Sequence, residues 1–234
     1  MEQPQDDLAA VAALSEPARR RLYGFVREQG TPVSREAAAA ATGMSLNLVA
    51  FHLDKLVSLG LLKSHHGRLP DAPAQRGRAP KLYQVSGTEI SASVPARSYD
   101  LSSDILLDAI EAQLEGETPH ATVLRAARAR GMQLGQQVRA DREDGGRAPS
   151  AAELAQQVLD EQGFEPYLDD TSTIRLRNCA FHRLAQRSPD LVCSMNRAFI
   201  EGLLRGVGDD VAEAALAPRE GQCCVAVSPV KRIA

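Results

Sequence analysis

Cysteine is the residue type whose placement in this 234-residue chain most strongly indicates chemistry. Cys179, Cys193, Cys223 and Cys224 all lie in the last 56 residues, and His182 follows Cys179 by three positions. Thiolate and imidazole groups bind zinc, and thiolates also hold iron–sulfur clusters. The spacing matches no common zinc-finger pattern. Two interpretations therefore stay open at this point: a metal or cluster site, or small buried apolar side chains.

The cysteines are expected at the ends of elements, where separate segments can converge. Alternating patterns predict strands at 164–168 and 173–177, with Cys179 just after the second. A helix over 191–207 would carry Cys193 near its start, and a final strand is predicted over 223–227. Because adjacent side chains in a strand point to opposite faces, we predict that Cys223 is a ligand and that Cys224 faces away.

The N-terminal third has the pattern of a helix-turn-helix unit. Apolar residues recur at helical spacing over 8–28, with Ser15 as the expected cap before Pro17. Ser34 is placed to cap a short helix through 41, and Ser45 caps a second helix that ends at Gly60. The predicted buried stripe of that second helix is Leu46, Val49, Leu53, Leu56 and Leu59.

The first turns of this second helix are expected to enter the major groove of DNA. Asn47 suits an adenine edge, and Ala50 and Phe51 suit a thymine methyl group. Lys55 is placed for a phosphate. The predicted DNA-binding set also includes Ser45 and His52, of which His52 is either structural or DNA-facing. The alternative is a plain surface helix of a three-helix bundle.

Residues 61–85 predict a wing, in which short strands at 61–63 and 82–85 flank a Gly- and Pro-rich loop. A flexible basic loop suits phosphate or minor-groove contact, whereas the simpler alternative is a solvated loop. The basic residues in this stretch are Arg68, Arg76, Arg78 and Lys81.

The N-terminal segments resemble the ArsR-type winged helix-turn-helix transcriptional regulators. The resemblance covers about residues 8–86 and implies a homodimer that binds double-stranded operator DNA. It does not carry over arsenic sensing, since the first 178 residues contain no cysteine. The matching segments are LSEPARRRL (14–22), LVAFHLDKL (48–56), GLL (60–62) and RGRAPKLY (76–83).

The C-terminal segments resemble the SufR-like branch of these regulators, which repress iron–sulfur cluster assembly operons. This resemblance implies a cluster held by Cys179, Cys193 and Cys223, with Cys224 or His182 as the fourth ligand. Some members carry a further cysteine between the second and the last, and residues 194–222 contain none. The fourth ligand would then be labile or non-cysteine, or the site would hold zinc. The matching segments are NCAFH (178–182), LVCSMN (191–196), GLL (202–204) and GQCCV (221–225).

Charge is distributed unevenly along the chain, whose net charge is −3. Residues 1–85 hold 11 Lys and Arg against 8 Asp and Glu, a net of +3, and the remainder holds 16 against 22, a net of −6. This asymmetry fits a DNA-reading domain joined to an acidic effector domain. No nucleotide-binding loop, serine motif or paired-carboxylate motif occurs in the sequence, so we do not expect an enzyme.

The expected fold class is α+β. We expect a flexible N-terminus (1–7), a winged helix-turn-helix domain (8–86), linker and dimerisation helices (87–140) and a cysteine-containing sensor domain (150–234). Helices are predicted at 101–114, 122–138, 150–162, 181–187 and 211–216. Apolar runs are too short to span a membrane and residues 1–7 lack a signal-peptide core. We therefore expect a cytoplasmic protein with reduced thiols.

These predictions describe a DNA-binding regulator, expected to be a repressor, that senses through an iron–sulfur cluster. The alternative is a winged-helix regulator with a zinc-binding or small-molecule-binding C-terminal domain.

Overall fold

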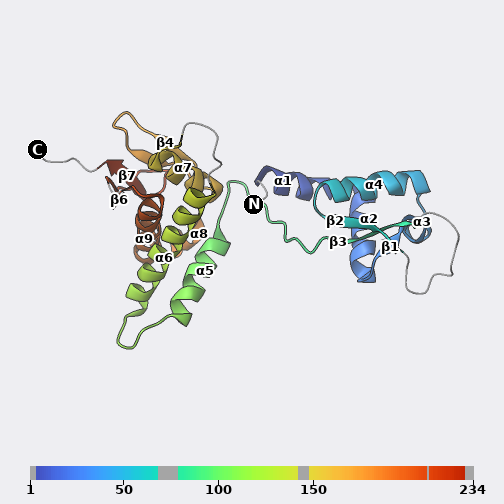
Figure 1. Ribbon diagram of the computed structural model, residues 1–234, viewed down its shortest axis with the longest axis horizontal. Helices are drawn as coiled ribbons and strands as arrows, with labels where there is room; N and C mark the ends of the chain where they lie inside the picture. Colours follow the sequence, from blue (N-terminus) through green and yellow to red (C-terminus); the bar gives the residue numbers. More distant parts are fainter. Residues whose placement is uncertain (1–3, 68–78, 142–147, 210, 230–234) are drawn as a thin grey trace, which may run out of the picture. The chain divides into compact units, whose positions relative to one another are not determined.

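The computed structural model describes residues 4–67, 79–141, 148–209 and 211–229. The chain divides into two compact units, Met1–Ser93 and Val94–Ala234, and both mix helices with a small sheet (Figure 1). The boundary differs from the prediction, because residues 94–140 belong to the unit that carries the cysteines and form no separate connector.

The first unit holds four helices and a three-stranded sheet. The helices are α1 (Pro4–Ala13), α2 (Pro17–Gln29), α3 (Arg35–Thr42) and α4 (Leu46–Ser58). The strands are β1 (Val33–Ser34), β2 (Leu62–His66) and β3 (Lys81–Val85), which pair antiparallel in the order β1-β3-β2. Helix α1 already covers residues 4–7, where a flexible terminus was predicted.

Capping side chains set the helix starts in this unit. Ser34 and Ser45 accept hydrogen bonds from the backbone N–H groups three residues later, as predicted. Helix α2 differs, because the Glu16 carboxylate, and not Ser15, caps it by accepting from the Arg19 N–H at 2.8 Å. Gly43 ends α3 in the left-handed conformation and opens the tight turn to α4.

The core of the first unit lies between α2, α4 and the sheet. Val49, Leu53 and Leu56 of the predicted stripe are buried, but Leu46 is 48% exposed. Leu46 is the first residue of α4, where no neighbouring element covers it. The other fully buried side chains of this core include Leu22, Leu62 and Tyr83.

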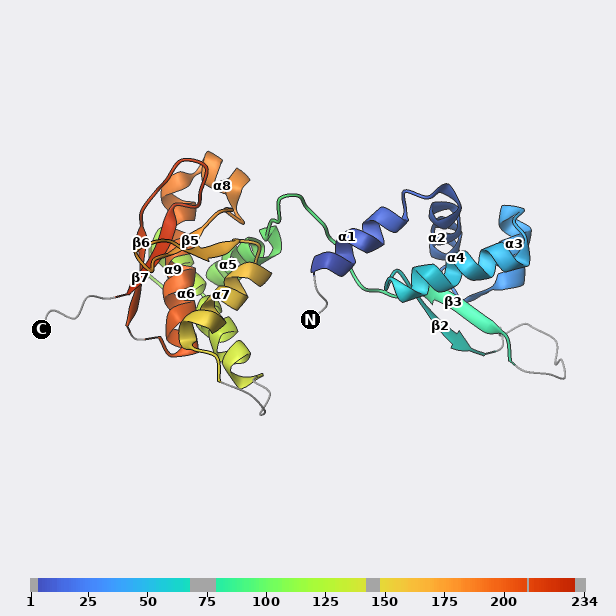
Figure 2. The ribbon, with the colours of Figure 1, turned by 90° about the horizontal axis from the view of Figure 1, so that it is seen from above.

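In the described residues of the second unit, five helices accompany a four-stranded antiparallel sheet (Figure 2). The helices are α5 (Tyr99–Glu111), α6 (Pro119–Ala140), α7 (Ala151–Glu161), α8 (His182–Arg187) and α9 (Pro189–Val207). The strands are β4 (Pro166–Leu168), β5 (Ile174–Leu176), β6 (Ala212–Leu216) and β7 (Val225–Pro229), in the order β4-β5-β7-β6. Helices α7 and α9 contact this sheet. Residues 212–216 form a strand, so the predicted short helix over 211–216 is wrong.

Helices α6 and α9 are in backbone contact. A Cβ atom on Gly131 of α6 would lie 2.0 Å from the Phe199 carbonyl oxygen, and one on Gly202 of α9 would lie 2.0 Å from the Arg128 carbonyl oxygen. Gly135 and Gly206 meet one turn further along with similarly little space. Only glycine fits at such positions, so α9, which carries Cys193, is locked against α6.

Candidate functional site

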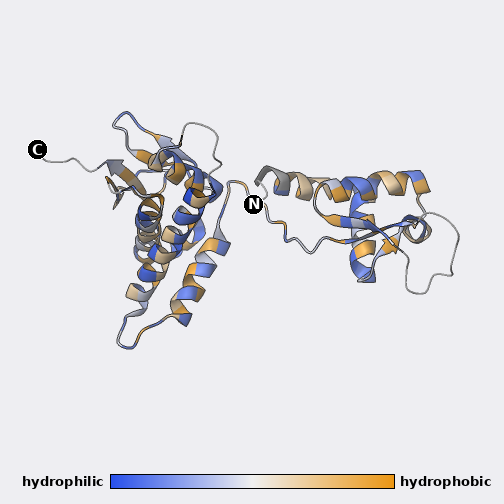
Figure 3. Ribbon diagram, viewed as in Figure 1, coloured by the Kyte–Doolittle hydropathy of each residue, from blue (hydrophilic) through white to orange (hydrophobic). Residues whose placement is uncertain are grey.

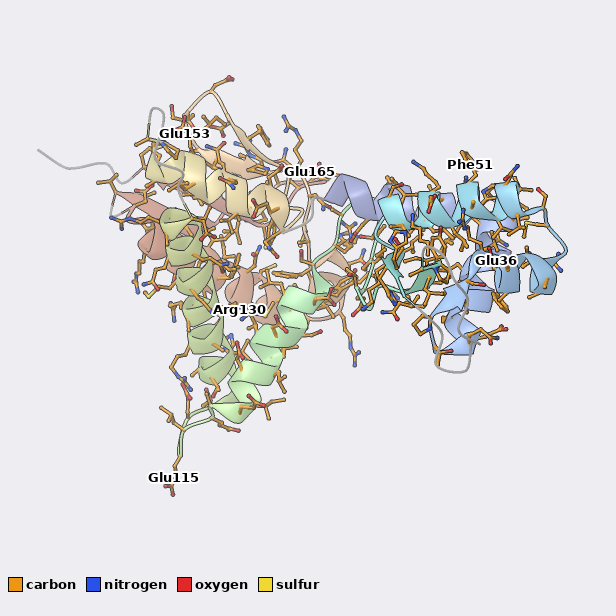
Figure 4. The ribbon with its side chains drawn as sticks, turned by 45° about the vertical axis from the view of Figure 1, so that its right-hand side comes forward. Glu36, Phe51, Glu115, Arg130, Glu153 and Glu165 are labelled. Carbon is orange, nitrogen blue, oxygen red and sulfur yellow. The ribbon has the colours of Figure 1, made fainter. Side chains whose placement is uncertain are left out.

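The exposed face of α4 carries most of the predicted DNA-contacting residues. Asn47, Phe51 and Lys55 are exposed, and Ala50 is half-buried. Phe51 is 64% exposed and projects from the outer face of the helix (Figure 4). Ser45 stands at the N-terminus of α4 with its hydroxyl bonded to the Leu48 N–H at 3.4 Å. The surface at the start of α4 therefore combines the polar Ser45 and Asn47 with the exposed apolar side chains of Leu46, Leu48 and Phe51.

His52 does not belong to this face. It is only 7% exposed, and its Nδ1 lies 3.9 Å from a carboxylate oxygen of Glu16 at the start of α2. Its ring meets Phe51 edge-on at 5.3 Å between centroids. Because residue 52 lies three positions after Val49 and four before Leu56, helical periodicity puts it on the buried stripe. The inclusion of His52 in the DNA-facing set is therefore wrong.

Lys81 is held by an acidic partner on α4. Its Nζ lies 2.6 Å from Asp54 Oδ1, and the Tyr83 hydroxyl donates to the same oxygen at 2.8 Å. Partial burial disfavours the Asp54 carboxylate, but the bonds from Lys81 and Tyr83 outweigh it, so the pKa of Asp54 lies below its ordinary value. Burial and the bond to Asp54 raise the pKa of Tyr83. This network ties the wing strand β3 to α4, a role that the sequence did not reveal.

The predicted wing contacts Arg68, Arg76 and Arg78 lie outside the residues that the structure describes. Lys81 stays on the wing, but as the partner of Asp54 it is not free for a phosphate in this conformation.

The four cysteines converge in the second unit. Cys179 lies in the turn between β5 and α8, Cys193 in the first turns of α9, and Cys223 and Cys224 in the turn before β7. Three pairs of thiols interact and link the four side chains into a series. The pairs are Cys179 with Cys223, Cys223 with Cys224, and Cys224 with Cys193. All four are free, and Cys223 is the buried one. Segments far apart in the chain thus meet at one group of thiols.

The position of Cys224 differs from the prediction that it lies in a strand and faces away from the site. Strand β7 begins at Val225, so both cysteines precede it, in a turn where Gly221 has a φ of 72°. Alternation of side chains applies only within the strand, and Cys224 turns toward Cys193 instead of away from the site. Gly221 favours a turn, and it was the residue in the sequence that could have predicted this difference.

Burial and contacts between the thiols raise the pKa values of Cys179, Cys193 and Cys223. The contact with Cys223 and burial raise the pKa of Cys179 far above its ordinary value, and burial raises that of Cys193. For Cys223 the contact with Cys179 favours the thiolate, but the contact with Cys224 and burial outweigh it and raise the pKa to about 11. Four thiolates at this site would therefore need a bound cation to replace their protons.

His182 lies apart from this interacting set. It is exposed at the first position of α8 and lines a cavity of about 430 Å³ next to Cys179. Within the described ranges, no three His, Cys, Asp or Glu side chains are arranged to hold a single metal ion. The other residues that line the cavity include Arg97, Glu165 (labelled in Figure 4), Arg177, Asn178 and Gln222.

Asn178 holds the wall of this cavity in place. Its amide Nδ2 donates to the carbonyl oxygens of Ala96 at 2.7 Å and Gly163 at 2.6 Å, and its Oδ1 accepts from Arg97. These bonds fasten the segment before α5 to the strand exit that carries Cys179. Asn178 and Asn196 both lie in the matching C-terminal segments, but the sequence predicted no role for either residue. The amide of Asn196 contacts Cys223.

The comparisons with known proteins bear on the first unit. Residues 14–65 match a family model described as a helix-turn-helix domain, which covers α2 to the start of the wing. No curated protein matches the chain. Among the helices that the structure describes, none is long and apolar enough to cross a membrane. The N-terminal unit therefore contains a helix-turn-helix domain, the kind of domain found in DNA-binding regulators.

Proposed function

We propose that this protein is an ArsR-type, sequence-specific transcriptional repressor whose C-terminal cysteines hold an iron–sulfur cluster that controls operator binding. The observation that carries the DNA-binding half is the helix-turn-helix match over residues 14–65. The observation that supports the sensing half is the convergence of all four thiols at one place in the second unit.

The start of α4 is the proposed reading surface. Asn47 presents an amide able to pair with an adenine edge, and Ala50 and Phe51 present apolar groups for thymine methyls. A largely exposed Phe51 side chain contributes little to the core of its own unit, so contact with DNA explains it better than stability does. Lys55 follows one turn later for the phosphate backbone.

A second copy of the chain is the proposed partner of α5. Leu106 and Leu107 are exposed on α5 at spacings of four and three from Ile110, which is 73% exposed, and Leu114 is exposed just after the helix ends. Hydrophobic residues are visible along this helix in Figure 3. A two-fold symmetric dimer would bury this stripe against itself and would present two α4 helices to a symmetric operator.

The donor set fits an iron–sulfur cluster better than a single ion. Thiolates are the usual protein ligands of such clusters, and here four thiols interact in a series, with the Asp190 carboxylate acting on Cys193. A single zinc ion needs four ligands at about 2.3 Å in a tetrahedron, and among the described residues no three such side chains are arranged for one ion. A cluster of several iron atoms is wider and accepts more widely separated sulfurs. When bound, it would supply the redox-sensitive group of the sensor.

The residues of the second unit provide a path from the thiols to the proposed dimer helix. Cys193 lies on α9, α9 is in backbone contact with α6, and α5 packs on α6. Tying Cys179, Cys193 and the 223–224 turn to one group would fix the start of α9. Loss of the bound group would free all three segments to move, and the movement of α9 would change the position of α5 through α6.

The cavity beside Cys179 supports a second candidate function. Its lining carries two guanidinium groups, from Arg97 and Arg177, against the one carboxylate of Glu165, which suits a small molecule with an anionic group. In that case the cysteines would be structural or zinc-binding and the ligand would be the signal.

Metal analysis of protein purified without air separates these candidates. We expect a brown protein with visible absorption bands and with iron and acid-labile sulfide in similar amounts. A colourless protein that contains zinc, or no metal under these conditions, would exclude the cluster.

A further inference from the structure

Asn196 is a deeply buried polar side chain in contact with the thiol site. It lies on α9 three residues after Cys193, so both residues share one face of the helix. The side chain is 1% exposed, and its Nδ2 donates to the Cys223 sulfur at 3.2 Å. Its Oδ1 is also buried and has no hydrogen-bond partner in the part of the chain that the structure describes.

Stability of the fold does not account for an amide at this position. Burying a carbonyl oxygen without a partner is unfavourable, and a bond from N–H to an uncharged sulfur is weak. Val192 and Ile200, one turn before and after Asn196 on α9, are both buried and apolar. A leucine has the same branched skeleton of heavy atoms and would occupy this place without an unsatisfied polar atom, although its two methyl groups are larger than the amide.

We propose that Asn196 is a positioning residue of the thiol site, which holds the Cys223 sulfur beside Cys179 and Cys224 and stabilises negative charge on it. A hydrogen bond to an ionised group is about twice as strong as one between neutral groups. The bond from Asn196 therefore gains strength when Cys223 becomes a thiolate ligand. This inference rests on the proposed function and deepens it, since hydrogen bonds to ligand sulfurs help to set the reduction potential of a cluster.

The test compares Asn196→Leu with Met195→Leu. Met195 is the adjacent buried residue, and its exchange for leucine conserves volume and leaves every hydrogen-bond donor in place. In the cluster-loaded protein, we expect Asn196→Leu to lower the reduction potential, because the N–H donor favours the more negative, reduced form. At a fixed potential the ratio of oxidised to reduced cluster should rise about tenfold, which corresponds to about 59 mV for one electron. Met195→Leu should leave the potential unchanged.

Nuclear magnetic resonance of the apoprotein tests the hydrogen bond without any cluster. The side-chain amide signal of Asn196, identified by its loss in Asn196→Leu, should shift in Cys223→Ala. The corresponding signal of Asn47, in the other unit, should stay in place.

Two results would overturn the proposal: a reduction potential that is unchanged in Asn196→Leu, or an Asn196 amide signal that does not shift in Cys223→Ala. If no cluster forms in any sample, the proposed function fails, and the amide signal alone then decides the role of Asn196.

Discussion

At the scale of single residues, burial separates side chains that one helix carries side by side. Phe51 and His52 are neighbours on α4, yet Phe51 is largely exposed and His52 faces the Glu16 carboxylate inside the unit. Substitution of Phe51 should therefore change DNA binding and leave stability nearly unchanged, whereas substitution of His52 should lower stability. Surface side chains can be removed with little effect on stability, whereas buried ones cannot.

Phe51→Ala is expected to weaken operator binding about tenfold or more while leaving the thermal midpoint of the protein nearly unchanged. The reason is the loss of an apolar contact to a base edge, which is worth roughly 1–3 kcal/mol. Fluorescence anisotropy with labelled operator DNA, together with thermal unfolding, measures both. His52→Ala is the matched comparison and should lower the thermal midpoint. Operator affinity that is the same in Phe51→Ala and wild type would remove Phe51 from the reading surface.

Cys224→Ser is expected to reduce cluster content as strongly as Cys179→Ser or Cys193→Ser does. The contact of Cys224 with both Cys193 and Cys223 places it within the site. Iron and sulfide analysis of anaerobically purified variants checks this. A Cys224→Ser protein that retains a full cluster would show that this thiol is only a neighbour of the ligands.

Asp54→Asn is expected to loosen the wing. It should also remove the contribution of Asp54 to the pH dependence of folding stability at acidic pH. The folded-state pKa of Asp54 is lowered, so its stabilising contribution is present above the unfolded pKa, about 3.9. That contribution is lost as pH falls through the lower, folded value. The side chain is half exposed, so the effect is small, about 1 kcal/mol or less. Acid unfolding followed by circular dichroism should show that the wild type is more stable than Asp54→Asn above about pH 4 and that this difference in stability disappears below it.

At the scale of elements, the sequence predicted the local structure better than the contacts between segments. The caps at Ser34, Ser45 and Ser150 were predicted and are present, because a cap depends on a few adjacent residues. The strand at 212–216 was mistaken for a helix, because its alanines fit either period and only pairing with β7 decides. The tie between Asp54 and Lys81 spans 27 positions, and no local pattern reveals it. The meeting of the thiols was expected mainly from the resemblance of the C-terminal segments.

Gly202→Ala is expected to destabilise the second unit by several kcal/mol, because the added methyl group would overlap the Arg128 carbonyl oxygen of α6. The matched control is Gly24→Ala in α2, where an added Cβ has open space around it. That change should stabilise its helix by roughly 0.5–1 kcal/mol. Chemical denaturation of both variants gives the comparison. Equal stability of the two would contradict the close contact of α6 with α9.

At the scale of the whole molecule, we propose that the helix-turn-helix unit and the thiol-bearing unit form one regulator that acts as a dimer. Ile110→Glu places a charge in the middle of the exposed stripe on α5. It should convert the dimer to a monomer and weaken operator binding, because one α4 helix then contacts one half-site. Sedimentation equilibrium reports the change in mass. A variant that remains dimeric would assign the interface elsewhere.

The most direct test of the central claim is operator affinity of one preparation before and after cluster removal, at a single fixed salt concentration because phosphate contacts make binding salt-dependent. The account predicts that the cluster-loaded protein binds its operator at least about tenfold more tightly than the apoprotein, a coupling of roughly 1.4 kcal/mol, and that Cys193→Ser binds as the apoprotein does. Equal affinity of the loaded and apo forms, with Cys193→Ser indistinguishable from both, would contradict cluster control of DNA binding.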